Sequence, residues 1–261
     1  MIPALWISKT GLDAQQTNIS VTSNNLANSS TIGYKKSRAI FEDLLYQKIN
    51  QPGGRSTSDS YLPEGLMLGA GTRVVSTHKD HSQGDVETTD NSFDLMIDGR
   101  GYFEIEMPDG TTAYTRNGQF TKDDEGTIVT SGEGFTLLPQ MQVPENAESL
   151  SVSLDGVVSV TLPDGSTTDL GQITVTDFIN PSGLEPIGMN LYLETAASGA
   201  PQQSIGGEDG MGTVRQGMLE TSNVEVTTEL VNLIEEQRVY EMNSKVLTTV
   251  DDMMGALINA V

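Results

Sequence analysis

The chain has no cysteine, few aromatic residues and no long apolar run. The lack of cysteine excludes disulfide bridges, thiolate metal ligands and a cysteine nucleophile, although it leaves the redox compartment open. No apolar run approaches the ~20 residues that a membrane-spanning helix needs. The N-terminal stretch lacks both a basic region and a long apolar core, so we expect no cleavable secretory signal. We therefore expect either a cytoplasmic protein or export by another route.

Basic residues are also scarce, since 14 lysines and arginines face 36 acidic residues, which gives a net charge of −22. Such a surface repels nucleic acid phosphates and anionic lipid headgroups, so we expect no nucleic acid partner and no direct membrane insertion. The two ends differ in sign: residues 1–50 carry five basic and three acidic groups, whereas residues 220–261 carry two basic and eight acidic groups. Opposite charges favour pairing of the two ends with each other.

Both ends show an apolar residue at every seventh position. The N-terminal set is Leu5, Leu12, Ile19 and Leu26, and the C-terminal set is Val226, Leu233, Tyr240, Leu247, Met254 and Val261. A helix with such a stripe must meet another helix, because a lone helix leaves the stripe in water. The pattern predicts a helical segment over residues 1–46 and a C-terminal helix over residues 220–261. An ordinary surface helix packed on its own domain is the alternative interpretation.

Turn signals divide the region between the helices, residues 64–219, into short segments. Strands are predicted near residues 93–97, 102–107, 150–154, 157–162, 173–178 and 191–193, and Pro-Asp-Gly sequences at 108–110 and 163–165 predict tight turns. Short strands joined by such turns are typical of an antiparallel sandwich or barrel. The predicted fold class is α+β, with long N- and C-terminal coiled-coil-type helices pairing together and a central antiparallel β-rich domain.

Two shorter features lie between the first helix and the β-rich region. Phe41, Leu44, Leu45 and Ile49 would share one face of a helix, so a second short amphipathic segment is predicted from Phe41 to Ile49. Residues 47–63 are expected to form an extended arm or loop, because residues 51–60 are poor in apolar side chains and rich in glycine and serine.

The sequence nominates no catalytic, cofactor-binding or metal-binding residue. His78 and His81 flank Asp80 without a convincing third ligand, so solvated histidines are favoured over a metal site. The acidic run at residues 123–125 lacks the alternating ligands of a calcium loop and predicts a hairpin turn instead. A binding or adhesion module and an acidic hydrolase stay as alternatives, although no carboxylate can be singled out for catalysis.

Three stretches resemble the bacterial flagellar rod and hook proteins. The first is SNNLANSSTIGYKK, the second is the central DLMIDGRGYFEIEMPDGTTAYTRNGQF, and the third is the C-terminal GMLETSNVEVTTELVNLIEEQRVYEMNSK. The first stretch carries the family pattern at Asn24, Asn25, Ala27, Asn28, Thr31, Gly33, Tyr34 and Lys35. The C-terminal stretch carries it at Leu219, Glu220, Ser222, Asn223, Val224, Glu229, Leu230, Gln237, Arg238, Tyr240, Glu241 and Asn243. Tyr34 and Tyr102 stand where phenylalanine is common in the family, and Val239 stands where alanine is common. The resemblance covers nearly the whole chain.

The resemblance implies a structural subunit of the rod, without enzymatic activity or cofactor, that travels unfolded through the flagellar type III export apparatus without a cleaved signal. Further stretches resemble rod subunits more than hook subunits, which usually carry additional outer domains, although another axial protein of the family remains the alternative. The implied location is the basal body, with the rod in the periplasm. The implied partners are further copies in a helical homopolymer, proximal rod proteins, the hook protein and the surrounding P and L ring proteins. The two apolar stripes would form the assembly seam, and the arm at residues 47–63 would stiffen the rod.

Overall fold

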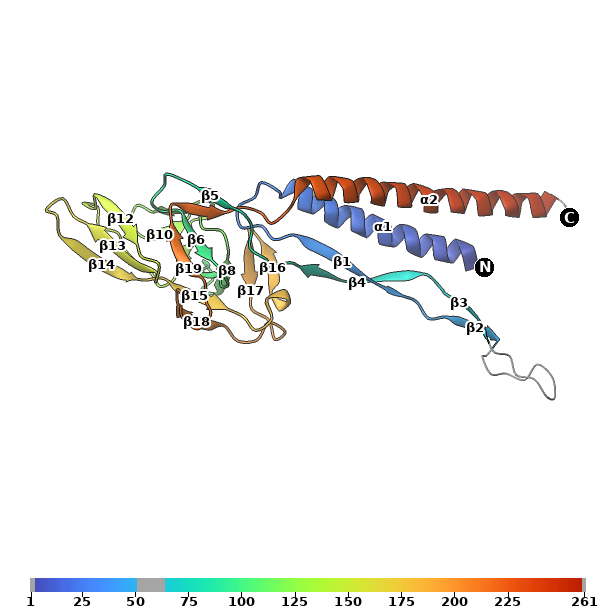
Figure 1. The fold of residues 1–261 in the computed structure, drawn as a ribbon, viewed down its shortest axis with the longest axis horizontal. Coiled ribbons are helices and arrows are strands. Elements are labelled where there is room, and N and C mark those ends of the chain that lie inside the picture. The colour runs from blue at the N-terminus through green and yellow to red at the C-terminus, as the bar shows by residue number, and fades with distance from the viewer. Residues whose placement is uncertain (1–2, 51–63, 260–261) are drawn as a thin grey trace. The chain divides into compact units, whose positions relative to one another are not determined.

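The computed structural model describes residues 3–50 and 64–259, and it divides the chain into two compact units (Figure 1). We call residues 1–27, 37–78 and 225–261 the terminal unit, and residues 28–36 and 79–224 the β unit. Residues 51–63, which include most of the predicted arm, and Val261 of the apolar stripe lie outside the described residues.

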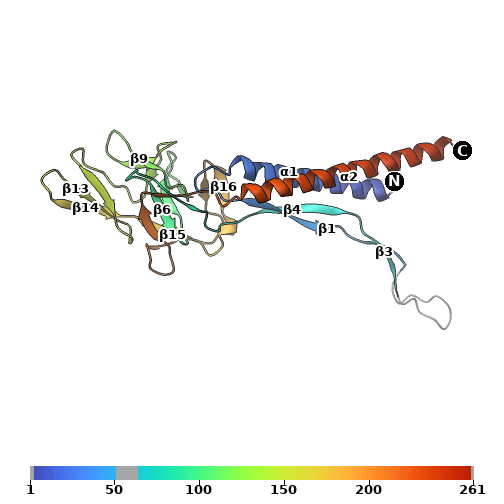
Figure 2. The same cartoon turned by 45° about the horizontal axis from the view of Figure 1, so that its top comes forward.

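Two long helices dominate the terminal unit. Helix α1 runs from Pro3 to Ala27 and helix α2 from Val226 to Asn259. They lie side by side and antiparallel (Figures 1 and 2), with Gly11 of α1 against the side chain of Asn243 and Asn18 of α1 bonded to Glu236 of α2. The prediction of one long helix at each end is confirmed. Neither helix contains, within its described residues, an apolar stretch long enough to cross a bilayer.

The predicted helix at Phe41 to Ile49 is wrong, because these residues lie in extended backbone. Strand β1 (Ser37–Asp43) pairs with β4 (Thr72–Lys79), and β2 (Gln47–Asn50) pairs antiparallel with β3 (Leu66–Leu68). Between the strands the Leu44 amide donates to the Gly71 carbonyl at 2.8 Å. The spacing of the four apolar residues fits one face of a helix, and the strand pairing with residues 66–79 overrides this local pattern.

The final helix begins at Val226 rather than at residue 220. Residues Met218–Glu220 form strand β20, which pairs with β5 (Val86–Thr88), and the Thr221 amide extends this pairing by donating to the Asp85 carbonyl at 2.8 Å. These backbone bonds hold the segment extended. The helical pattern starts only where the Glu229 amide donates to the Glu225 carbonyl at 3.0 Å.

Antiparallel strands build the β unit, as predicted. Its largest sheet has the order β16-β17-β8-β7-β11-β10-β9, its three-stranded sheet has the order β12-β13-β14, and the remaining pairs are β15 with β18, β19 with β6 and β20 with β5. The strands not yet bounded are β6 (Leu95–Asp98), β7 (Phe103–Glu106), β8 (Thr112–Thr115), β9 (Phe120–Lys122), β10 (Ile128–Thr130), β11 (Thr136–Leu137), β12 (Ser149–Val152), β13 (Val157–Thr161), β14 (Thr167–Gln172), β15 (Thr174–Asp177), β16 (Glu185–Gly188), β17 (Leu191–Leu193), β18 (Gln202–Ile205) and β19 (Thr213–Gln216). A 3-10 turn spans Pro181–Gly183.

The turns and the core of the β unit follow from its sequence. Gly110 and Gly165 close the two Pro-Asp-Gly turns with φ angles of 78° and 77°, which glycine adopts without strain. The acidic run at residues 123–125 is the predicted hairpin turn between β9 and β10. Alternate strand residues such as Phe103, Ile105 and Val158 point into one buried apolar cluster. This packed cluster gives a fixed frame for the polar groups described next.

Candidate functional site at the junction of the two terminal motifs

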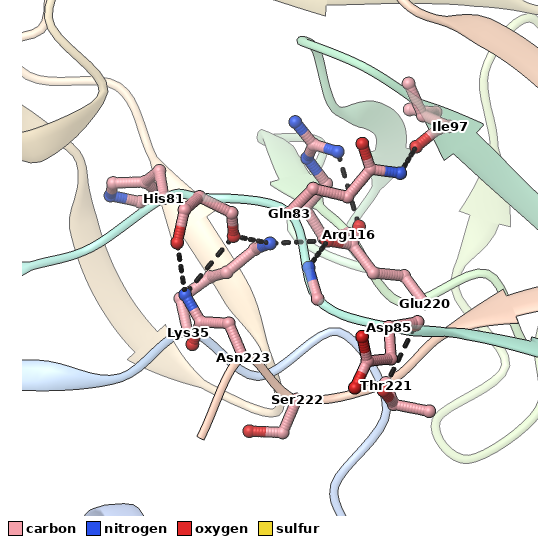
Figure 3. Close-up of polar contacts among 12 residues, drawn as sticks. Lys35, His81, Gln83, Asp85, Ile97, Arg116, Glu220, Thr221, Ser222 and Asn223 are labelled. Carbon is pink, nitrogen blue, oxygen red and sulfur yellow. Dashed lines mark hydrogen bonds and ion pairs between the residues drawn. The ribbon is translucent and has the colours of Figure 1, made fainter. Parts of the chain in front are cut away.

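The two family-like stretches meet inside the β unit through a buried ion pair. Lys35, near the end of the first stretch, is 0% exposed, and Glu220, near the start of the C-terminal stretch, is 1% exposed. The Lys35 Nζ donates to Glu220 Oε1 at 2.5 Å and to the Ser82 carbonyl at 2.6 Å (Figure 3). Residues 185 positions apart in the sequence are thereby joined without access to water.

Strand β20 positions Glu220, and several donors complete the coordination of its carboxylate. The Gly84 amide donates to Oε1 at 2.9 Å, and Arg116 Nη1 donates to Oε2 at 3.3 Å. The backbone carbonyl of Glu220 accepts from the Gly33 amide at 2.8 Å. Because a buried carboxylate without donors is costly, this set of bonds compensates for the burial of Glu220 and holds its side chain in place.

Arg116 extends the cluster towards a group of aromatic side chains. Its Nη2 donates to the Gly99 carbonyl at 2.9 Å, and its guanidinium lies 5.2 Å from the centre of the Tyr102 ring. The Tyr102 hydroxyl and His81 Nδ1 form a hydrogen bond of 2.7 Å. Sequence reasoning gave Arg116 no role. The only sequence feature that pointed to Arg116 was its position in the central family-like stretch.

Burial controls the ionisation of this cluster. Burial lowers the pKa of Lys35, an effect that the Glu220 carboxylate opposes and Arg116 reinforces. Burial, with the positive charges of Lys35, Lys79 and Arg116, lowers the pKa of His81 to about 4. Burial also raises the pKa of Tyr102 well above its usual range. His81 is therefore neutral at pH 7. Its ring packs edge-on against the rings of Tyr102 and Tyr192.

Gly33 and Asn223 bring the two stretches close together around the ion pair. Gly33 has a φ of +70°, and a Cβ there would lie 2.8 Å from the backbone of both Arg116 and Asn117. The Asn223 Oδ1 accepts from the Lys36 amide at 2.8 Å, and its Nδ2 donates to the Asp80 carbonyl at 2.9 Å. Tyr34 is buried, with the Lys79 ammonium 5.1 Å from its ring centre.

The asparagines of the first stretch lie at or just after the C-terminal end of α1, and two of them form side-chain hydrogen bonds there. Asn25 Nδ2 donates to the Ser37 carbonyl at 2.8 Å, while the Ser37 amide donates to Asn25 Oδ1 at 2.9 Å. This pair of bonds fixes the start of β1 against the helix. Thr31 Oγ1 donates to Asn28 Oδ1 at 3.2 Å, and both Asn24 and Ala27 lie on exposed positions.

The residues of the predicted seam are only partly covered. On α1, Leu5, Leu12, Ile19 and Leu26 are half-buried, as are Leu233, Leu247 and Met254 on α2. Val226 and Tyr240 are exposed, and so are the motif residues Gln237, Arg238 and Glu241. The structure brings the motif residues near residues 33–36 and 219–223 together. On α2 it leaves Gln237, Arg238 and Glu241 exposed, whereas Glu229 is buried and Asn243 lies against Gly11 of α1.

The junction connects the two terminal motifs through buried polar contacts. Its charged groups bond to one another and to the backbone, which makes the junction rigid. Over residues 3–50 and 64–259, no three His, Asp or Glu side chains are placed to share a metal ion. His81 is engaged with Tyr102, whereas His78 is exposed on β4.

Family models match three parts of the chain. Residues 6–35 match "Flagella basal body rod protein", residues 96–160 match "Flagellar hook protein FlgE/F/G D1 domain", and residues 215–260 match "Flagellar basal body rod FlgEFG protein C-terminal". The first of these matches contains Lys35 and the last contains Glu220, the two residues of the buried ion pair.

Curated relatives match over nearly the full length. The Flagellar basal-body rod protein FlgG of Buchnera aphidicola subsp. Acyrthosiphon pisum is 51% identical, over 98% of this chain and 99% of its own. The FlgG proteins of Caulobacter vibrioides and Bacillus subtilis are 45% and 38% identical, over 97% and 99% of this chain and 97% and 99% of their own. A solved structure, the Helicobacter pylori flagellar hook protein FlgE2, matches 71% of this chain and 43% of its own at 16% identity, with a TM-score of 0.25. The full-length matches show that the chain belongs to the family of flagellar basal-body rod proteins named FlgG.

Proposed function

We propose that this chain is a structural subunit of the flagellar distal rod, which polymerises through its terminal helices into a rigid tube that carries torque to the hook. Full-length similarity to proteins named FlgG is the observation that carries the proposal. Other axial proteins of the family, from the proximal rod or the hook, are the runner-up, and the full-length coverage favours the rod subunit. In this role the chain is not an enzyme.

The surface of α2 supports polymerisation through the helices. Leu230, Val231, Ile234 and Val246 are exposed apolar side chains on this one helix, and Val231 is 59% exposed. A soluble monomer rarely leaves so many large apolar side chains on one element. In the proposed polymer, the α1–α2 pairs of many copies meet in coiled-coil fashion through the predicted seam and form an inner layer, while the β unit forms an outer layer.

The ribbon that leads to the arm offers a second apolar surface. Leu45 is 91% exposed, and Ile49 and Leu66 on the paired strands β2 and β3 are about half exposed. We propose that this ribbon, with the arm at residues 47–63, lies against a neighbouring copy and stiffens the rod. The proposed partners beyond other copies are proximal rod proteins, the hook protein and the P and L ring proteins. The proposed place is the periplasmic rod, reached through type III export without a cleaved signal.

Limited proteolysis tests the proposal on the full chain. Dilute protein and the polymer formed at high concentration are digested in parallel, and the fragments are identified by mass. We expect both terminal segments to be cut in dilute protein and protected in the polymer, because assembly covers their apolar surface. Protection of both ends in dilute protein, with no polymer at any concentration, would refute the rod function and favour a self-contained module.

A further inference from the structure

The face on which α1 and α2 meet is mainly polar. On α2 the inward residues Glu229, Glu236, Asn243 and Val250 recur every seven positions, and only the last is apolar. Glu229, Glu236 and Val250 are buried, whereas the apolar residues at the other heptad position, such as Leu233 and Tyr240, are half-buried or exposed. The sequence pattern thus identified an apolar stripe, but the deepest positions of the pair belong to a different set.

Helix α1 presents a matching polar face. Ser8, Thr22 and Asn25 are buried, and Gly11 and Asn18 lie against α2. The apolar residues at every seventh position of α1 are only half-buried. Small and polar groups therefore join the two helices of one chain, which leaves both apolar stripes partly uncovered.

Glu236 lies at the centre of this face and is 8% exposed. Its Oε1 accepts from Asn18 Nδ2 at 2.6 Å and from Thr22 Oγ1 at 2.9 Å. Its Oε2 is buried without a hydrogen-bond partner among the described residues, which also supply it no ion pair. Burial, with the neighbouring charges of Glu229 and Glu235, raises its pKa, while the bonds from Thr22 and Asn18 oppose the rise.

A contact of this kind is poorly suited to provide stability. Apolar residues of similar volume in place of buried charges are often neutral or stabilising. A polar residue at an inward position of a helix pair instead specifies the register, because any other alignment leaves it without a partner. A slip by one heptad in one direction would place Asn25, which already bonds Ser37, opposite Glu236. A slip in the other direction would put Gly11, which has no side-chain donor, in the place of Asn18 and Gln15 in the place of Thr22. The repeated apolar stripes would match almost as well after such a slip.

We propose that the Glu236 carboxyl, seated on Asn18 and Thr22, sets the register of the α1–α2 pair. One fixed register presents the apolar side chains of both helices to neighbouring copies in a single alignment. This role rests on the proposed polymerisation, because the alignment matters only where copies meet. Glu236 is thus a positioning residue of the assembly.

Disulfide trapping tests the register directly, because the chain has no cysteine of its own. Gly11→Cys with Asn243→Cys reports the observed register, since a Cβ at Gly11 lies 3.5 Å from the Asn243 Cγ. Gly11→Cys with Val250→Cys reports a slip of one heptad. Both pairs are oxidised in polymer grown from the full chain, and intrachain disulfides are counted by mass.

In the parent sequence we expect the observed-register disulfide to dominate. Glu236→Leu should lower the ratio of observed to slipped disulfide by about tenfold, which corresponds to ~1.4 kcal/mol. Glu236→Gln, which keeps an acceptor for Asn18 and Thr22 without the charge, should restore the parent ratio. Glu241→Leu, the same replacement at an exposed position of α2, should leave the ratio unchanged. Restoration by glutamine separates register setting from a general loss of stability.

The failures of this inference and of the rod function are distinguishable. If the parent chain forms no polymer, the rod function fails. If the parent polymerises and Glu236→Leu keeps the parent ratio, Glu236 does not set the register and the rod function stands. If Glu236→Leu does not polymerise, Thr22→Val decides, since it removes one donor at constant size: a lowered ratio supports the proposal, and a parent ratio overturns it.

Discussion

At the scale of single residues, the Lys35–Glu220 ion pair joins two stretches that lie far apart in the sequence. Among the described residues, the carboxylate of Glu220 is the acid that forms ion pairs with both buried cations, Lys35 and Arg116. Breaking such a buried pair leaves an uncompensated charge, which is far more costly than the pair is stabilising. The two stretches therefore depend on each other through one carboxylate.

Glu220→Gln should lower the free energy of unfolding of the β unit by about 3–5 kcal/mol, because it leaves both cations without an anion. Thermal and denaturant unfolding followed by circular dichroism measure the loss. Glu87→Gln, on the paired strand β5 and exposed, is the matched control and should stay within ~0.5 kcal/mol of the parent. Equal midpoints for the two variants would show that the ion pair carries no stability.

His81 makes the β unit sensitive to acid. Its pKa lies at about 4 in the folded chain and near 6.5 in the unfolded chain, so the unfolded state binds more protons between these values. Stability is thus complete above about pH 6.5 and falls as the pH drops towards 4, by roughly 3 kcal/mol from this group. Denaturant midpoints across this range should flatten in His81→Phe but not in His78→Asn, whose side chain is exposed. The same slope in both variants would assign the effect to other groups.

At the scale of elements, local signals were sufficient where the contact partners lie close in sequence. The Pro-Asp-Gly turns and the two terminal helices were predicted because turn chemistry and heptad spacing act within a few residues. Residues 41–49 were misassigned because their apolar spacing fits a helix, and only the backbone of β4 and β3 makes them strands. The polar face around Glu236 was missed, since its heptad is visible only once Asn18 and Thr22 are known to lie opposite.

Gly33 tests the close approach of the elements at the junction. Gly33→Ala should destabilise the β unit by at least about 1–3 kcal/mol, because its φ is +70° and a Cβ would collide with the backbone of Arg116 and Asn117. Gly132→Ala is the control, as a Cβ there meets no atom within 4 Å and its φ is ordinary. Denaturant unfolding of both variants gives the comparison. A Gly33→Ala protein as stable as the control would mean that the approach relaxes at little cost.

At the scale of the whole molecule, exposed apolar side chains occur together with a large negative charge. Exposed apolar residues recur on α2 and on the β2–β3 ribbon, while residues 51–219 hold most of the excess acid. Like charge opposes association of copies, so the apolar surfaces must supply the attraction. We test the two proposed apolar contacts separately: the arm and the β2–β3 ribbon for the stiffness of the rod, and helix α2 for its assembly.

Deletion of residues 51–60 addresses stiffness. If the arm and its ribbon lie against a neighbouring copy, rods of the deletion variant should form but be curved or more flexible than those of the parent. Electron microscopy of the polymers measures their curvature. A variant that replaces the same ten residues with a Gly-Ser sequence of equal length controls for chain length. Straight rods in both variants would show that the arm does not stiffen the rod.

Leu233→Asp addresses assembly. The change places a charge on the half-buried apolar stripe of α2, where burial against a neighbouring copy costs several kcal/mol unless the group is protonated. Asn232→Asp adds the same charge at the adjacent exposed position and is the matched control. We expect Leu233→Asp to abolish polymer sedimentation while the β unit keeps its unfolding midpoint, and Asn232→Asp to polymerise. Normal polymers of Leu233→Asp would place the contact between copies elsewhere, and the exposed β2–β3 ribbon would then be the surface to change next.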